Sequence, residues 1–114
     1  MHSGDLLPAL KALAHETRLR MVEQLLAHNL CVGALAWRLG ISEAAASQHL
    51  QILRKAGLVK GEKQGYWTHY AVQSEELRRV ADRLGSLPDQ AGRLRDLNLE
   101  LCSGDSANPR KGGE

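Results

Sequence analysis

Apolar side chains recur at helical spacing through the first half of the chain, and the pattern then changes to alternation. Steps of three and four residues predict helices over 5–14, 15–28, 32–39 and 43–56. Around Gln64-Gly65, aromatic and β-branched residues alternate with polar ones, which is typical of a two-stranded hairpin with a glycine turn. We expect Asp5 and Ser74 to cap the first and last helices. The pattern predicts a mainly α fold with a small β-hairpin (α+β). The second helix is expected to turn inward Leu19, Val22, Leu25 and Leu26.

Residues 32–57 have the organisation of two short helices joined by a tight turn. Gly40 can end the first helix, because glycine adopts the left-handed conformation that a helix end requires. Ser42 can cap the second helix by accepting a backbone N–H. Two such helices predict a helix-turn-helix, whose second helix lies in the DNA major groove. The apolar stripes of the two helices are formed by Leu35, Ala36, Leu39, Ala46, Leu50 and Leu53.

The other face of the second helix carries small and neutral polar residues followed by basic ones. Small residues let the backbone approach DNA, Gln pairs with adenine, and Ser reaches donors or acceptors on base edges. The basic end is suited to phosphates. An ordinary amphipathic helix with a solvated polar face is the alternative. The candidate DNA contacts on this face are Ala44, Ser47, Gln48, His49, Gln51, Arg54 and Lys55.

The hairpin is expected to form a wing beside that helix. Lys60, Lys63 and Gln64 lie near its turn, where they can touch the DNA backbone or the minor groove. Residues 38–69 hold five basic residues and two acidic ones, a local net charge of +3. We expect Trp37 and Trp67 to pack internally. One hairpin face is predicted to hold Tyr66, Thr68, Tyr70 and Val72, and the other Trp67, His69 and Ala71.

The last helix carries leucines at heptad-like spacing, which favours contact with a second copy of the chain. Gly85 and Pro88 interrupt it, so a kink or break is expected near 85–88. A helix that merely covers its own core is the alternative. A dimer would place two half-sites about 34 Å apart on DNA. The predicted dimerisation residues are Leu6, Leu10, Leu77, Leu84, Leu94 and Leu101.

The bulk composition narrows the class of protein. With 114 residues the chain is expected to form one domain over 5–102, between a flexible N-terminus at 1–4 and a disordered tail at 103–114. It has no apolar run long enough to span a bilayer and no signal-peptide pattern. Its two cysteines suit a reducing cytoplasm, so we expect a cytoplasmic protein. It lacks the GxSxG, P-loop, HExxH and CxxC motifs, so we expect no enzyme.

Three blocks, HETRLRMVEQLL, LCVGALAWRLGISEAAASQHLQILRKAGLV and GYWTHYAV, resemble the ArsR/SmtB family of small bacterial winged-helix repressors. The resemblance covers about residues 5–101. It implies a homodimer, joined through its terminal helices, that leaves operator DNA when a metal ion, metalloid or oxidant reaches a sensor site. It also places at the DNA contacts Ser42, Glu43, Ala44, Ser47, Gln48 and His49. Glu43 replaces a commoner Gln, which favours a contact with cytosine or none.

The inducer is addressed by the cysteines. Thiol sensors of the family often begin the third helix with Cys-Val-Cys, whereas this chain has Cys31-Val32-Gly33. Cys31, helped by Cys102, could hold a soft metal or metalloid through thiolates. Cys31 could also be a redox switch at a helix N-terminus, or an inert buried thiol. The zinc site of the last helix is not expected, because residues 74–101 contain no histidine.

The sequence therefore predicts a DNA-binding transcriptional repressor released by a metal ion, a metalloid or a thiol oxidant. Two alternatives stay open. One is a winged-helix regulator without a thiol-based inducer. The other is a winged-helix protein–protein adaptor, since fold alone does not fix function.

Overall fold

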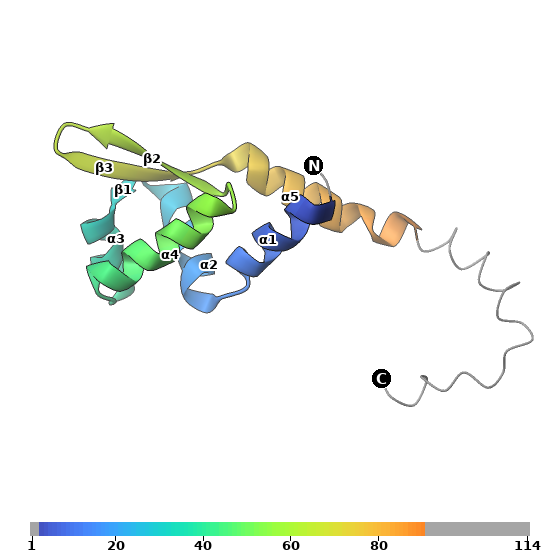
Figure 1. The fold of residues 1–114 in the computed structure, drawn as a ribbon, viewed down its shortest axis with the longest axis horizontal. Helices are drawn as coiled ribbons and strands as arrows, with labels where there is room; N and C mark the ends of the chain where they lie inside the picture. The colour runs from blue at the N-terminus through green and yellow to red at the C-terminus, as the bar shows by residue number, and fades with distance from the viewer. Residues whose placement is uncertain (1–2, 91–114) are drawn as a thin grey trace, which may run out of the picture. The chain divides into compact units, whose positions relative to one another are not determined.

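The computed structural model describes residues 3–90, which contain the predicted helices and a small sheet (Figure 1). The helices are α1 (Ser3–Leu13), α2 (Glu16–Ala27), α3 (Val32–Leu39), α4 (Glu43–Lys55) and α5 (Ser74–Ser86), and a 3₁₀ turn, η1, spans Pro88–Gln90. The strands are β1 (Leu30–Cys31), β2 (Val59–Gln64) and β3 (Trp67–Val72). The chain forms one compact unit up to Asp82 and a second from Arg83 onward. The predicted winged helix-turn-helix is confirmed.

The turn between α3 and α4 is built as its residues indicate. Gly40 ends α3 in the left-handed conformation, at φ +70°. Ser42 caps α4, because its Oγ accepts a hydrogen bond from the backbone N–H of Ala45 at 3.0 Å. The first helix differs from its expected start. It begins at Ser3, so Asp5 lies inside its first turn and does not cap it.

The sheet has three strands in the order β1-β3-β2, all antiparallel. The predicted hairpin is β2 and β3, with Gly65 at φ +69° in its turn. The strand β1 was missed, because two residues are too few to show an alternating pattern. Tyr66 was placed wrongly on a strand face. It lies in the turn with 98% of its surface exposed, because β2 already ends at Gln64.

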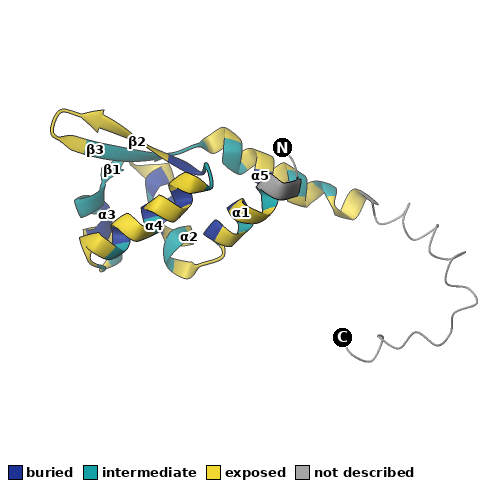
Figure 2. Cartoon of the chain, in the orientation of Figure 1, coloured by how far each residue is buried: buried dark blue, intermediate teal, exposed yellow. Residues whose placement is uncertain are grey.

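The core gathers one face of each helix, as the buried residues of Figure 2 show. On α2 the buried side chains are Met21, Val22 and Leu25. Leu19 and Leu26, expected to face inward, are 47% and 54% exposed, so that expectation was wrong. The two leucines are seven residues apart and share one flank of the helix, away from the buried stripe. The buried stripes of α3 and α4 are confirmed at Leu35, Ala36, Ala46, Leu50 and Leu53.

The last helix breaks where glycine and proline predict it. α5 ends at Ser86, and Pro88 begins η1. Val80 is buried and Leu77 packs against the core, whereas Leu84 is 41% exposed. Leu94, Leu101 and the predicted tail at 103–114 lie outside the described residues. Within 3–90, no helix has the length and apolar character needed to cross a membrane.

Candidate nucleic-acid interface

The helix α4 has one buried face and one free face, and Figure 2 shows its free side as exposed. Ser47 and Gln48 are exposed, and neither side chain has a hydrogen-bond partner among the described residues. Their donors and acceptors are thus unoccupied and face solvent. The other exposed residues of this helix and its cap are Ser42, Glu43, Ala44, Gln51, Ile52, Arg54 and Lys55.

Some candidate contacts on α4 are already engaged within the chain. Arg54 Nη1 donates to Gln51 Oε1 at 2.8 Å, so these two side chains form one polar unit on the surface. The carboxylate of Glu43 lies over the first turn of α3, where a Cβ built on Gly33 would come within 3.0 Å of Glu43 Oε2. A side chain at position 33 would therefore compete with Glu43 for space. This placement agrees with the expectation that Glu43 makes no base contact.

His49 is turned towards α2. It is half-buried, and its Nδ1 lies 3.2 Å from Nη1 of Arg18. The rings of His15 and His49 have centroids 4.8 Å apart. The pKa of His49 lies below its ordinary value, first because burial disfavours the charged ring, and then because His15 and Arg18 add positive charge nearby. The sequence gave no sign of this cluster, because its members come from two helices.

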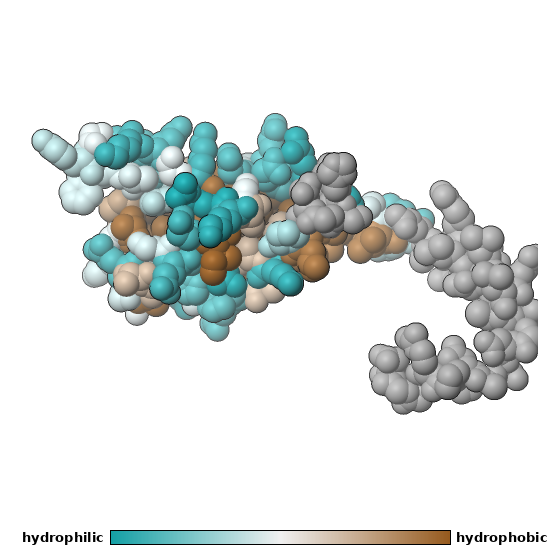
Figure 3. Space-filling model, in the orientation of Figure 1, coloured by the Kyte–Doolittle hydropathy of each residue, from teal (hydrophilic) through white to brown (hydrophobic). Residues whose placement is uncertain are grey.

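The wing projects a basic and aromatic tip. Lys63 and Gln64 are exposed, and Lys60 lies 3.6 Å from Glu62 in an exposed ion pair. In Figure 3 the wing is coloured mainly teal and white, so this surface is hydrophilic or neutral. Trp67 is 64% exposed and Trp37, on α3, is 83% exposed. The expectation that both tryptophans pack internally was wrong, because each points away from the stripe that its element buries.

The wing's shape depends on Gly61, which sequence reasoning missed. Gly61 stands opposite Tyr70 in the β2–β3 register. A Cβ at this position would lie 2.9 Å from Cε1 of Tyr70 and 3.0 Å from Cγ2 of Thr68. These contacts are closer than carbon atoms pack, so the two side chains occupy the space that a larger residue would need. A glycine inside a strand is the signal that indicates such a close approach.

The described cysteine lies at the junction of the sheet and α3. Cys31 is a free, half-buried thiol at the N-cap position of α3, and its side chain makes no capping bond. It pairs across the sheet with His69, whose Nδ1 is buried without a hydrogen-bond partner. Cys102 lies outside the described residues. Among residues 3–90, no group of three or more His, Cys, Asp or Glu side chains is placed to hold a metal ion.

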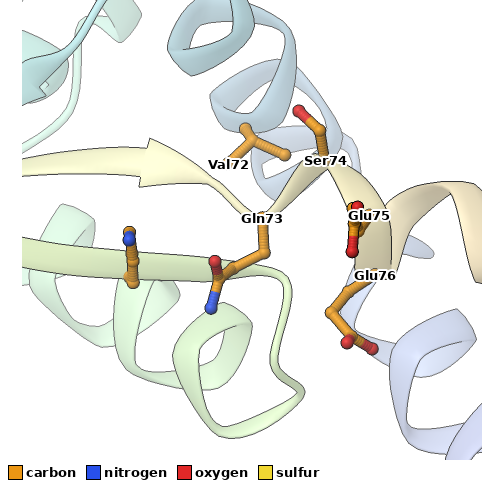
Figure 4. Close-up of a pocket in the computed structure, with 6 residues that line it drawn as sticks. Val72, Gln73, Ser74, Glu75 and Glu76 are labelled. Carbon is orange, nitrogen blue, oxygen red and sulfur yellow. The ribbon is translucent and has the colours of Figure 1, made fainter.

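Two pockets flank this surface. The first, of about 440 Å³, lies where β3 meets α5, and Figure 4 shows Glu75 and Glu76 on the helix side of it with Gln73 beside β2. Its carboxylates would repel phosphate, so it does not extend the candidate interface. The second, of about 310 Å³, is lined by three cations and no carboxylate. Its lining residues are Pro8, Lys11, Ala12, Arg18, Ile52, Lys55 and Ala56.

Comparison with known proteins gives consistent relatives. Residues 15–60 match the family described as "Bacterial regulatory protein, arsR family". The chain is 39% identical to the "Transcriptional activator HlyU" of Vibrio cholerae, over 79% of this chain and 83% of that protein. It is 37% identical to the "Arsenical resistance operon repressor" of Escherichia coli, over 86% of this chain and 89% of that protein.

A solved structure with the same fold comes from Mycobacterium bovis. It is titled a homodimeric winged helix-turn-helix DNA-binding domain of Mb0332, a possible ArsR-family regulator. It is 27% identical with a TM-score of 0.64, covering 77% of this chain and 82% of that one. All three of these proteins are named as regulators, and none as an enzyme.

Proposed function

Because this chain belongs to the arsR family of bacterial regulatory proteins, we propose that it is a homodimeric repressor that is released from operator DNA by a metal ion, a metalloid or a thiol oxidant. One observation carries the DNA-binding part of this proposal. The exposed face of α4 offers unpartnered neutral hydrogen-bonding groups, while its opposite face is fixed in the core. A rigid helix with a free polar face is what major-groove recognition requires.

The proposed contacts divide by chemistry. Ser47 and Gln48 read base edges, because their side chains are neutral and unoccupied. Lys55 and Lys63 neutralise phosphates and fix the register without reading sequence. Lys60 contributes less than Lys63, because Glu62 already offsets part of its charge.

Dimerisation is proposed through the terminal helices. Leu84 and Leu87 are 41% and 51% exposed, and Leu7 of α1 is 55% exposed. Leu6 and Leu10 pack partly against the chain's own core, so they would serve both surfaces. Exposed leucines on helices that end a chain favour a two-fold contact. The homodimeric title of the Mycobacterium bovis structure supports the same arrangement.

The proposed signal acts through the thiol at the start of α3. Cys31 lies at a helix N-terminus, where the helix dipole favours the thiolate, and α3 packs directly against α4. A thiolate ligates soft cations and reacts with oxidants. A bias of about 2–4 kcal/mol towards a dimer shape with the wrong half-site spacing would weaken DNA binding tens to hundreds of times.

DNA titration tests the proposal. A duplex recovered from a random library by selection on the wild-type chain serves as the operator, and a scrambled duplex serves as the non-specific competitor. Fluorescence anisotropy at several salt concentrations gives Kd for each. We expect log K to fall steeply with log salt, because phosphate neutralisation releases counterions. A salt-independent Kd, or no enrichment of any duplex, would exclude the proposed function.

Two exposed residues provide a matched pair of variants. Gln48→Ala should lower the preference for the operator over the scrambled duplex by roughly tenfold, the range for one bidentate base contact. Lys63→Ala should weaken both complexes equally and reduce the salt slope by about 0.9 or less. An equal loss of preference in both variants would contradict the division into base-reading and phosphate-binding residues.

A further inference from the structure

Arg18 connects three helices beneath α4. It belongs to α2, its Nε donates to the carbonyl oxygen of Ala12 in the last turn of α1 at 2.7 Å, and its Nη1 lies 3.2 Å from Nδ1 of His49 on α4. A guanidinium carries only donors and keeps its proton, so Nδ1 of His49 must be the acceptor. The ring of His49 is therefore neutral in this arrangement, with its proton on Nε2.

We propose that Arg18 and His49 are positioning residues that hold α4 in its DNA-reading orientation, and that protonation of His49 releases this hold and weakens DNA binding in acid. The proposal rests on the function proposed above, in which α4 reads DNA. It assigns His49 an internal role in place of the base contact that the sequence predicted. A protonated Nδ1 would present an N–H to the N–H of Arg18, so the hydrogen bond would become a repulsive contact.

The surroundings of His49 give a second proton no favourable partner. From α2 it faces His15 and Arg18. Lys11 of α1 and Lys55 of α4 line the same pocket as Arg18, and no carboxylate lines it. No charged group of α3 or β2 within residues 3–90 is recorded in contact with the ring. Every charge near His49 is therefore positive or becomes positive in acid, which agrees with the lowered pKa of this residue.

The direction of the pH effect separates this proposal from a direct DNA contact. If His49 touched a phosphate, the anion would favour the charged ring and binding would tighten as pH falls. If His49 holds Arg18, binding weakens as pH falls below the ordinary histidine pKa of about 6.5. The sign follows from linkage, because a state that excludes the proton loses stability where the competing state binds it.

His49→Asn provides the test variant, because its amide oxygen accepts a hydrogen bond and does not titrate. His15→Asn is the matched control. The ring of His15 caps α2 by accepting from Thr17 N–H at 3.1 Å, and Asn is a favoured cap that also does not titrate. Kd for the selected operator duplex is measured by anisotropy at about pH 8 and about pH 5.5 at constant ionic strength, with circular dichroism to confirm folding at both.

We expect the Kd of the wild type and of His15→Asn to rise roughly tenfold between the two pH values, the effect of losing one hydrogen bond to a charged group. The corresponding ratio for His49→Asn should stay below about twofold. Tighter binding of the wild type in acid, or parallel pH profiles for the wild type and His49→Asn, would overturn the inference alone. Absence of specific binding by the wild type at about pH 8 would overturn the proposed function and this inference together.

A second variant tests the partner of His49. Arg18→Lys keeps the charge but has no planar fork with which to reach both Ala12 O and His49 Nδ1. It should bind the operator more weakly at about pH 8 and should lose most of the pH dependence. In the double variant Arg18→Lys/His49→Asn, the two effects should be clearly less than additive, since both remove one contact. Full additivity in folded variants would show that the residues act independently and would refute the proposed link.

Discussion

A single methyl group at Gly61 would test whether close packing shapes the wing. In the β2–β3 pair Gly61 faces Tyr70, and a Cβ would stand 2.9 Å from Cε1 of that ring and 3.0 Å from Cγ2 of Thr68. Both neighbours are half-buried side chains of β3. Gly61→Ala must therefore displace them or spread the two strands.

The expected magnitude is the difference between two effects. Overpacking of this kind costs about 1–3 kcal/mol. Replacing glycine also restricts the unfolded chain, which stabilises the fold by about 0.4–1 kcal/mol. The free energy of unfolding should therefore fall by about 1–2 kcal/mol, which lowers Tm by about 5–10 °C in a domain of this size. Because the wing then shifts, both operator and scrambled DNA should bind more weakly.

Thermal unfolding followed by circular dichroism measures the change, and two other glycines supply controls. A Cβ at Gly85 of α5 meets nothing within 4 Å, so Gly85→Ala should stabilise the fold by about 0.5 kcal/mol. At Gly33 the only close atoms belong to the flexible end of Glu43, so Gly33→Ala should be close to neutral. If Gly61→Ala melted at the wild-type temperature, the packing of Tyr70 and Thr68 would not define the wing.

The remaining predictions concern the cap, the thiols and the dimer. Ser42→Ala should lower the free energy of unfolding by about 1 kcal/mol through loss of the bond to Ala45 N–H, and Ser42→Asn should restore it in chemical denaturation. Cys31→Ser should abolish release from DNA by arsenite, cadmium, copper or peroxide, and Cys102→Ser should reduce it; normal release in both variants would exclude a thiol sensor. Leu84→Asp should shift the chain from dimer to monomer in sedimentation velocity and weaken operator binding, whereas an unchanged dimer would remove Leu84 from the interface.

The helix-turn-helix could be predicted from the sequence because each of its signals is local. Gly40 ends α3 and Ser42 caps α4 through contacts within three or four residues. The buried stripe at Ala46, Leu50 and Leu53 follows from helical spacing alone. The same local reasoning located the wing at Gly65 and the end of the last helix near Pro88.

Features that depend on distant segments were missed. The strand β1 is visible only through its pairing with Tyr70 and His69. Trp37 and Trp67 were assigned to the interior because of their residue type, although burial depends on which face of an element meets its neighbours. Leu19 and Leu26 were assigned inward for the same reason, while α2 buries Met21 instead.

The chain by itself determined the order of its elements, the turn chemistry and the polar face of α4, because spacing and end signals act between near neighbours. Only the folded arrangement decided which of the polar residues remain free. It turned His49 to Arg18, laid Glu43 over Gly33 and left Ser47 and Gln48 open to solvent. The physical reason is that a hydrogen bond between helices depends on how they pack, and packing brings together residues that are far apart in sequence.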